Sequence, residues 1–308
     1  MSLNVYYDLK YAPATFDFAH FLSFSNAVRQ DLKSNDMSIN IICEQFRQKS
    51  TRDKLLEVSE RKWRVNHILL KLANLIPEVS SVTVNSGYLS EKKIPSFPIG
   101  YPPHPGDKEY TIPYSGAYLR HFYDSKHINL RPFRASEQAK NYINNLFRDD
   151  VITITLRNSE YQPKRNSNLE EWYKVYQAIK KTRFRPIVIP CFEDCMKNKS
   201  YAKYDWEVWE PGCTEIDLRL ALYEKSHDNL CINNGTSYFC INSNKLKQLS
   251  ILSTPPFEFV VTPDGYNLIP CVKLESLTFL ISSEFNSSVK KRVIKGSKLE
   301  CLVYLLMS

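Results

Sequence analysis

The sequence predicts an α/β protein of two domains, each built on a parallel sheet with helices on its faces. Short apolar segments typical of strands alternate with longer segments whose apolar residues recur at helical spacing, and this alternation occurs twice along the chain. Between the two series, residues 94–133 are rich in proline and contain three glycines, which indicates irregular chain. A length of 308 residues suits two such domains.

The first domain is expected to cover residues 1–133. Its predicted elements, in order, are a strand at 3–7, a helix that follows Asp17 from Phe18 to about Val28, a strand at 38–43, a helix over 52–75 that Pro77 ends, and a strand at 82–84. Strands separated by helices pair in parallel, because the helix carries the chain back to the starting edge of the sheet.

The second domain is expected to cover residues 134–308. Its predicted elements are a helix at 134–147, a strand at 151–156, a helix at 169–181, a strand at 186–190, a helix at 214–225 and a strand at 229–232. Beyond Lys245 the pattern weakens into short apolar segments at 257–261 and 277–281 and a basic run at 290–298. We assign no element there.

Composition removes several classes of protein. The chain has 8 glycines, where average usage of about 7% would give roughly 22. No G-x-G-x-x-G and no G-x-x-x-x-G-K-[ST] can be written, so dinucleotide enzymes and P-loop phosphotransferases are not expected. The hydrophobic content of 43% and mean hydropathy of −0.38 fit a globular protein without a transmembrane segment.

Charge and cysteine usage point to a cytoplasmic protein that does not bind nucleic acid. The net charge is +8, but each half of the chain carries a surplus of only four basic groups, so neither is a basic module. The 8 cysteines form no C-x-x-C pair and are expected to be reduced. The first residues show no basic segment followed by an apolar run, so we expect no secretory signal. Contact with a membrane surface stays open.

The loop after the strand at 151–156 is the first candidate site. Arg157 ends that strand, and Lys164, Arg165, Asn166 and Asn168 precede the next helix. Arginine and lysine at the carboxyl end of a parallel strand suit a diphosphate, and an asparagine or Ser167 would cap a helix whose free amides favour an anion. The alternative is an ordinary helix cap with surface cations.

The turn after the strand at 229–232 is the second candidate site. It contains Asn233, Asn234, Gly235, Thr236 and Ser237 and leads into a predicted helix. A polar turn with one glycine lets backbone amides approach a phosphate or a ribose. Asn-Gly is also a common turn without any ligand.

Short motifs along residues 3–245 resemble bacterial glycosyltransferase-like proteins. The motifs are YYDLKYAPATFDF, FRASEQA, TLRNSEY, RNSN, EEW, LALYE and NNG. The stretch DLRLALYEKSHDNLCINNGTSYF is similar to the donor-contacting helix, strand and turn of lipopolysaccharide heptosyltransferases, and VITITLR resembles the strand and arginine of fucosyltransferases. The resemblance implies the GT-B architecture, in which two Rossmann-like domains face one another across a cleft and the C-terminal one holds the nucleotide-sugar.

The resemblance also implies roles for particular residues. It places the base that takes the proton of the acceptor hydroxyl at Asp17, which is otherwise an acid favoured at a helix start. Asp8, at the end of a predicted strand, is the alternative base. Glu224, on the helix before Asn233, is a candidate ribose contact, and the alternative is an ordinary exposed helix residue. Arg219, five residues before Glu224, is not on quite the same helical face. There are departures: Ala14, Thr15 and Phe16 stand where a glycine is usual, and Asn233 replaces an aspartate.

No metal site is expected, because the six histidines lack ligand spacing and no Asp-x-Asp occurs. We therefore expect an enzyme, a metal-independent glycosyltransferase of the hexosyl, heptosyl or fucosyl class. It would use a nucleotide diphosphate sugar as co-substrate and no cofactor, act on a glycan acceptor, and serve lipopolysaccharide or polysaccharide biosynthesis. Two alternatives remain: a polysaccharide pyruvyl transferase-like enzyme, and a catalytically inactive binding or scaffold protein of the same fold.

Overall fold

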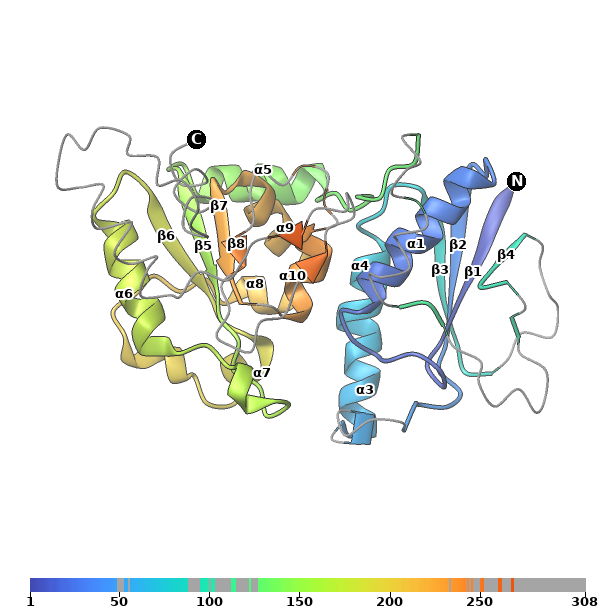
Figure 1. Cartoon of the computed structure of the whole chain (residues 1–308), viewed down its shortest axis with the longest axis horizontal. Coiled ribbons are helices and arrows are strands. Elements are labelled where there is room, and N and C mark those ends of the chain that lie inside the picture. The colour runs from blue at the N-terminus through green and yellow to red at the C-terminus, as the bar shows by residue number, and fades with distance from the viewer. Residues whose placement is uncertain are drawn as a thin grey trace. The chain divides into compact units, whose positions relative to one another are not determined.

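The computed structural model describes residues 1–48, 53–54, 56–87, 95–99, 101–102, 112–114, 122, 127–232, 234–241, 243, 245, 250–251, 260–261 and 267–268. The chain divides into two compact units, with the change between Arg134 and Ala135 and a return to the first unit at Tyr238–Asn244. Each unit carries a four-stranded parallel sheet (Figure 1). The prediction of an α/β class with parallel sheets is therefore confirmed.

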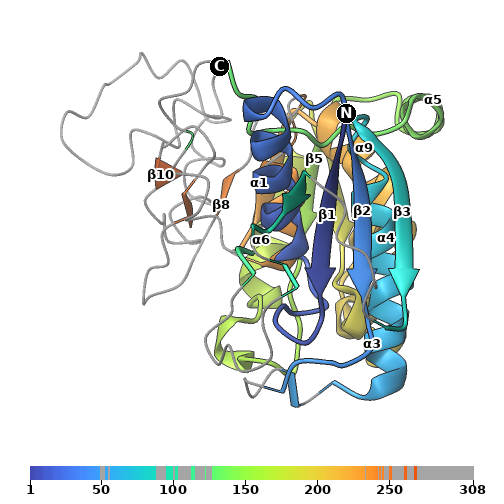
Figure 2. The same cartoon turned by 90° about the vertical axis from the view of Figure 1, so that its right-hand side faces the viewer.

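The sheet of the first unit has the order β3-β2-β1-β4. Its strands are β1 (Ser2–Asp8), β2 (Asp36–Ile42), β3 (Val79–Asn85) and β4 (Ser96–Phe97). Figure 2 shows β1, β2 and β3 side by side, and Val5 lies opposite Ile39 in the register of the first two. The predicted strands at 3–7, 38–43 and 82–84 correspond to β1, β2 and β3.

The helices of this unit pack on its sheet. α1 (Phe18–Asp31) buries Phe18, Phe21 and Leu22 completely, which explains the predicted spacing. The predicted helix over 52–75 is interrupted: Asp53 and Lys54 are helical, Glu57 is extended, and α3 (Val58–Arg64) continues through a π-helical turn at Val65–Leu69 into α4 (Leu70–Ala73). The Arg61 side chain donates to the carbonyls of Asp53 and Leu56 and so ties the chain before the interruption to α3.

Strand β4 was not predicted, because it lies within the proline-rich segment. Pro95 and Pro98 flank it, and the Pro95 carbonyl accepts a hydrogen bond from the Asn4 amide at 3.0 Å. β4 is an edge strand, where flanking prolines remove no hydrogen bond that the sheet needs. The chain runs from β1 to β2 and β3 on one side and then places β4 on the other side of β1, so the strand order reverses between β1 and β4.

The sheet of the second unit has the order β6-β5-β7-β8. Its strands are β5 (Val151–Thr155), β6 (Arg185–Ile189), β7 (Asp228–Cys231) and β8 (Ser250–Ile251). β5 pairs with β6 on one side and with β7 on the other, so the strand order reverses between β5 and β7. A separate ladder joins β9 (Val260–Val261) and β10 (Asn267–Leu268). The predicted segment at 257–261 is described only at its end, and the one at 277–281 lies outside the described residues.

Helices flank both faces of this sheet. They are α5 (Glu137–Leu146), α6 (Leu169–Lys180), α7 (Phe192–Met196), α8 (Pro211–Thr214), α9 (Ile216–Lys225) and α10 (Gly235–Ile241), with 3-10 turns at Pro163–Arg165 and Ser200–Lys203. In Figure 1, α6 lies on one side of the sheet, with α5 and α9 on the other. The predicted helices at 134–147, 169–181 and 214–225 correspond to α5, α6 and α9.

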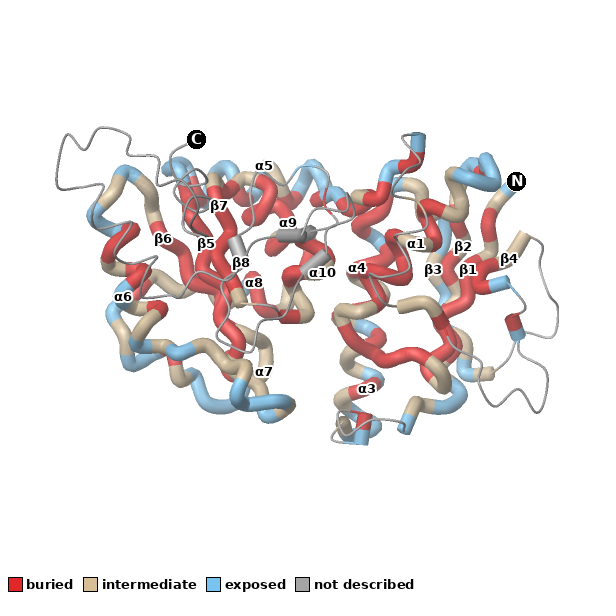
Figure 3. The backbone as a smooth tube through the Cα atoms, viewed as in Figure 1, coloured by how far each residue is buried: buried red, intermediate tan, exposed pale blue. Residues whose placement is uncertain are grey.

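The interior of the second unit is centred on β5. All five of its residues are buried, as Figure 3 shows along the strand, and Trp172 of α6 is 1% exposed. A parallel strand that is covered on both faces has a continuous run of apolar residues. This run is why β5 could be predicted from the sequence. The helices within the described ranges are all too short or too polar to cross a bilayer.

Candidate functional site

In open parallel sheets, ligands bind beyond the carboxyl ends of the strands where the strand order reverses. In the first unit this point lies between β1 and β4, and it holds a buried acid. Asp8, the last residue of β1, is 1% exposed. Its carboxylate accepts hydrogen bonds from the Lys10 amide at 2.9 Å and from the Tyr101 hydroxyl at 3.1 Å. Burial raises the pKa of Asp8 above its ordinary value, although both hydrogen bonds oppose this.

Asp17 lies in the same unit, at the start of α1. It is half-buried, and its Oδ2 accepts a hydrogen bond from the Thr15 hydroxyl at 2.5 Å. Its side chain makes no capping hydrogen bond to the helix. An acid at the start of a helix is also favoured by the helix dipole, which needs no such hydrogen bond, so this alternative to a catalytic role stays open.

His20, one turn further along α1, packs beside Asp17. Burial lowers the pKa of His20 to about 4, while the charge of Asp17 acts in the opposite direction. The imidazole is therefore neutral at pH 7. It packs against the Tyr238 ring in a tilted arrangement, with ring centroids 4.4 Å apart and planes at 41°. Sequence reasoning treated this histidine as structural. Its spacing of three residues from Asp17 on one helical face was the available signal.

In the second unit, Arg157 follows β5 and is 8% exposed. Its Nη1 donates to the Gln162 carbonyl at 3.1 Å and to the Asn166 side-chain oxygen, and its Nη2 donates to the Tyr161 carbonyl. Gln162 has a left-handed backbone with φ of 51°, a conformation that costs energy for a side chain of this kind. The guanidinium thus holds the loop of residues 158–167 in a defined shape.

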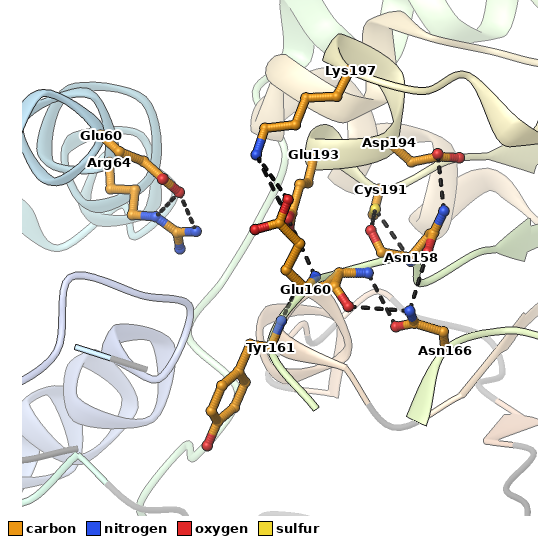
Figure 4. Close-up of polar contacts among 11 residues, drawn as sticks. Glu60, Arg64, Asn158, Glu160, Tyr161, Asn166, Cys191, Glu193, Asp194 and Lys197 are labelled. Carbon is orange, nitrogen blue, oxygen red and sulfur yellow. Dashed lines mark hydrogen bonds and ion pairs between the residues drawn. The ribbon is translucent and has the colours of Figure 1, made fainter. Parts of the chain in front are cut away.

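A polar network connects this loop to the end of β6 (Figure 4). Asn158 donates from Nδ2 to Asp194 at 3.0 Å and to the Ser200 hydroxyl at 3.1 Å, and its Oδ1 accepts from Asn166 at 3.1 Å. The Cys191 thiol donates to the Asn158 carbonyl at 2.8 Å. Apart from Asn166, no residue of this network was selected from the sequence, because its members come from separate loops.

The remaining residues of the first candidate loop occupy different environments. Lys164 is exposed, and Arg165 is half-buried with its Nη1 donating to the Gln162 side chain at 2.7 Å. Asn168 caps α6 by accepting from the Glu171 amide at 3.4 Å, as one of the predicted alternatives required. Ser167 instead accepts from the Arg157 amide at 2.9 Å.

The second candidate turn folds onto the start of α10. Asn234 accepts at Oδ1 from the Ser237 amide at 3.0 Å and from the Thr236 hydroxyl at 2.7 Å, and the Ser237 hydroxyl donates to the Asn234 carbonyl at 2.6 Å. Gly235 is the first residue of the predicted helix. Asn233 lies outside the described residues.

Glu224 is placed away from both loops. It is 8% exposed, and its Oε1 accepts from the Ala135 amide at 3.2 Å, which ties the last turn of α9 to the chain before α5. Lys140 of α5 lies 3.9 Å from its other oxygen. These contacts explain the burial of Glu224 without a ligand, and a contact with ribose stays a prediction.

Within the described ranges the acidic, histidine and cysteine side chains form neither a metal-ligand cluster nor a disulfide bond. Across the described ranges, no three histidine, cysteine, aspartate or glutamate side chains come together as metal ligands would. Six cysteines in this part of the chain are free thiols, and burial raises the pKa of Cys191 and of Cys213. Cys271 and Cys301 lie outside the described residues.

The chain is an α/β protein in which each unit has a polar site where its strand order reverses.

Two solved structures share this fold across most of the chain. The E. coli ADP-heptose LPS heptosyltransferase II is 11% identical over 93% of this chain and 100% of its own, with a TM-score of 0.50. A glycosyl transferase family 9 structure from Veillonella parvula is 12% identical over 100% of this chain and 97% of its own, with a TM-score of 0.52. No family model and no curated protein sequence matches the chain.

Proposed function

We propose that this protein is a glycosyltransferase that moves a sugar from a nucleotide diphosphate sugar to a glycan acceptor. The observation that carries the proposal is the opposite charge of the two reversal points: a pair of carboxylic acids near the end of β1 and arginines near the end of β5. Glycosyl transfer needs both, because a base takes the acceptor proton while cations stabilise the departing diphosphate. The fold likeness to a heptosyltransferase supports the same class.

Asp17 is the base in this proposal. The acceptor oxygen attacks the anomeric carbon of the donor sugar, its proton passes to the Asp17 carboxylate, and the bond from that carbon to the diphosphate oxygen breaks. Asp8 is the weaker candidate, because it is 1% exposed and already accepts from Lys10 and Tyr101. Asp17 is only half-buried, so an acceptor can reach it more easily.

The donor site in this proposal is formed by the loop after β5 and the turn before α10. Arg157 shapes the loop, Lys164 and Arg165 supply charge towards the diphosphate, and Asn166 and Asn168 fix the loop ends. The turn of Asn233, Asn234, Gly235, Thr236 and Ser237 would seat phosphate or ribose, with Glu224 as a further ribose contact. The reaction is proposed to be independent of metal and to take place in the cytoplasm. We also propose a relation of this chain to fucosyltransferases, and it is supported by one feature, the position of Arg157 directly after β5.

A thermal unfolding panel tests the proposal. UDP-, GDP-, ADP-, CMP- and dTDP-sugars and phosphoenolpyruvate are added separately, and a ligand that binds the folded state raises the unfolding temperature. One nucleotide should do so, and the double variant Lys164→Gln, Arg165→Gln should reduce the shift. The control is Lys181→Gln with Arg183→Gln, which removes two exposed charges elsewhere in the same unit.

Each result of the panel selects one function. A shift with phosphoenolpyruvate alone would favour pyruvyl transfer. If a sample that unfolds cooperatively shows no shift with any compound, the result contradicts the proposed enzymatic function and favours a binding or scaffold protein. An equal loss of the shift in both double variants would show that net charge alone is responsible, and the loop would no longer be the donor site.

A further inference from the structure

A second arginine of the second unit is more deeply buried than Arg157 and has far fewer partners. Arg219 lies in the first half of α9 and is 3% exposed. Its Nε donates to the Tyr223 hydroxyl at 2.8 Å, and its guanidinium carbon lies 5.5 Å from the centroid of the Tyr223 ring. Among the described residues its side chain makes no other hydrogen bond and has no carboxylate within ion-pair distance.

This environment is unusual for a group that stays charged. Arginine keeps its proton in proteins and carries five N–H donors in a planar fork. A buried charge is costly unless it is paired and hydrogen-bonded, so buried arginines normally have acidic partners. Arg157 satisfies this requirement with carbonyl and amide oxygens, whereas Arg219 has one phenol.

The position of the guanidinium within the sheet is known from its neighbours. The Tyr223 hydroxyl that holds it is also 2.7 Å from the hydroxyl of Thr155, the last residue of β5. Burial raises the pKa of the Cys231 thiol, at the end of β7, and the nearby Arg219 charge acts in the opposite direction. Arg219 therefore lies by the carboxyl ends of β5 and β7, where the strand order reverses.

We propose that Arg219 is a binding residue for the diphosphate of the donor, held at the carboxyl edge between β5 and β7 by Tyr223 and Thr155. The proposal rests on the proposed function and names a phosphate contact that lies outside both candidate loops. A diphosphate supplies the missing negative charge, and its oxygens can accept from two N–H groups of the fork at once. The hydroxyl pair orients the guanidinium before the ligand arrives.

Binding of inorganic pyrophosphate and of ADP, UDP and GDP, measured by calorimetry, tests the assignment. Arg219→Gln should weaken binding of pyrophosphate, and of the nucleotide that binds, at least about tenfold, since it removes charge-assisted hydrogen bonds. Arg219→Lys keeps the charge but not the fork and should give an intermediate loss. Arg183→Gln, an exposed arginine of the same unit, is the matched control and should leave affinity within about twofold.

A second measurement uses the unaltered protein, in case Arg219→Gln does not fold. The Nε–H resonance of Arg219, assigned as the signal that Arg219→Lys removes, should move when pyrophosphate saturates the protein. A resonance that does not move, or an Arg219→Gln variant that binds as tightly as the wild type, overturns the assignment while the proposed function stands. A wild-type protein that binds neither pyrophosphate nor any of the nucleotides contradicts the proposed function itself, and the assignment fails with it.

Discussion

The two sheet edges use the same topology and carry opposite chemistry. In the first unit the strand order reverses beside Asp8, with Asp17 and His20 at the start of the following helix. In the second unit it reverses beside Thr155, with the buried arginines Arg157 and Arg219 nearby. Carboxylates and imidazoles change charge in an accessible pH range, whereas guanidiniums do not.

The fold fixes where a site lies, and the side chains fix what the site does. The two units should therefore respond differently to pH and to ionic strength. Changes of pH should act on the first unit through Asp8 and His20, whose pKa values are displaced by burial. Changes of ionic strength should act on anion binding by the second unit. Substitutions and pH changes in each unit test this division.

Asp17→Asn should cause the largest change. Loss of the general base is expected to lower the rate of donor consumption on the order of 10²–10⁴-fold while donor affinity stays within about twofold. The rate is measured as release of nucleoside diphosphate from the donor that stabilises the protein in the panel. Asp31→Asn, an exposed acid at the other end of α1, is the control. An unchanged rate would move the base elsewhere, with Asp8 as the next candidate.

Arg157→Ala should destabilise the second unit by about 3–4 kcal/mol, because it removes charged hydrogen bonds and leaves the loop oxygens of Tyr161, Gln162 and Asn166 without their donor. Urea unfolding monitored by tryptophan fluorescence measures the loss. Arg183→Ala, which is exposed, should change stability by no more than about 0.5 kcal/mol. Equal stability of the two variants would show that Arg157 does not support the loop.

Acidification should destabilise the first unit through His20. The pKa of His20 is lowered to about 4, so between pH 6.5 and 4 the unfolded chain binds this proton and the folded chain does not. The stability is present above pH 6.5 and is lost as the pH falls, by about 3 kcal/mol in total.

Urea unfolding of wild type and His20→Gln at pH 7 and pH 4.5 tests this expectation. The wild type should lose more stability than the variant, and the exposed His127, changed to Gln, should behave as wild type. Parallel losses in the wild type and in His20→Gln would place the acid sensitivity in another group.

Asp8→Asn should have the smallest effect and the opposite pH dependence. Burial raises the pKa of Asp8, so the folded chain keeps this proton to a higher pH than the unfolded chain, and stability is lost as the pH rises from about 4. The asparagine carries no charge and can still accept from the Lys10 amide. The urea concentration at the midpoint of unfolding should therefore exceed that of the wild type by more at pH 7 than at pH 3.5. An advantage that does not change with pH would contradict the raised pKa.

Much of the fold could be predicted because its strands are short apolar runs between helices of regular spacing. The strands β1, β2, β3, β5, β6 and β7 all lie where the pattern placed them. The pattern failed for β4, whose two residues sit between prolines, and for the helix at 52–75, which is interrupted at the extended residue Glu57. The first failure reflects pairing with β1, a distant segment that a local pattern does not contain.

The candidate site could be predicted less completely. Asn168 and the turn of Asn234 and Gly235 were recognisable, because caps and turns are local features. Arg157 was recognisable as an arginine after a strand, but its bonds to its own loop were not. Arg219 was passed over, since a charged residue in a helix is usually exposed.

The α/β class, the order of most elements and the sign of the charge after β1 and β5 depend on residue type and spacing along the chain, and so could be read from the sequence. Which of these charges already have partners depends on segments that meet only in the folded chain. Arg157 and Arg219 are both buried, yet one donates to loop carbonyls and the other to the Tyr223 hydroxyl beside Thr155. The partners of a buried charge come from distant segments, so its availability for a ligand is a property of the packed molecule.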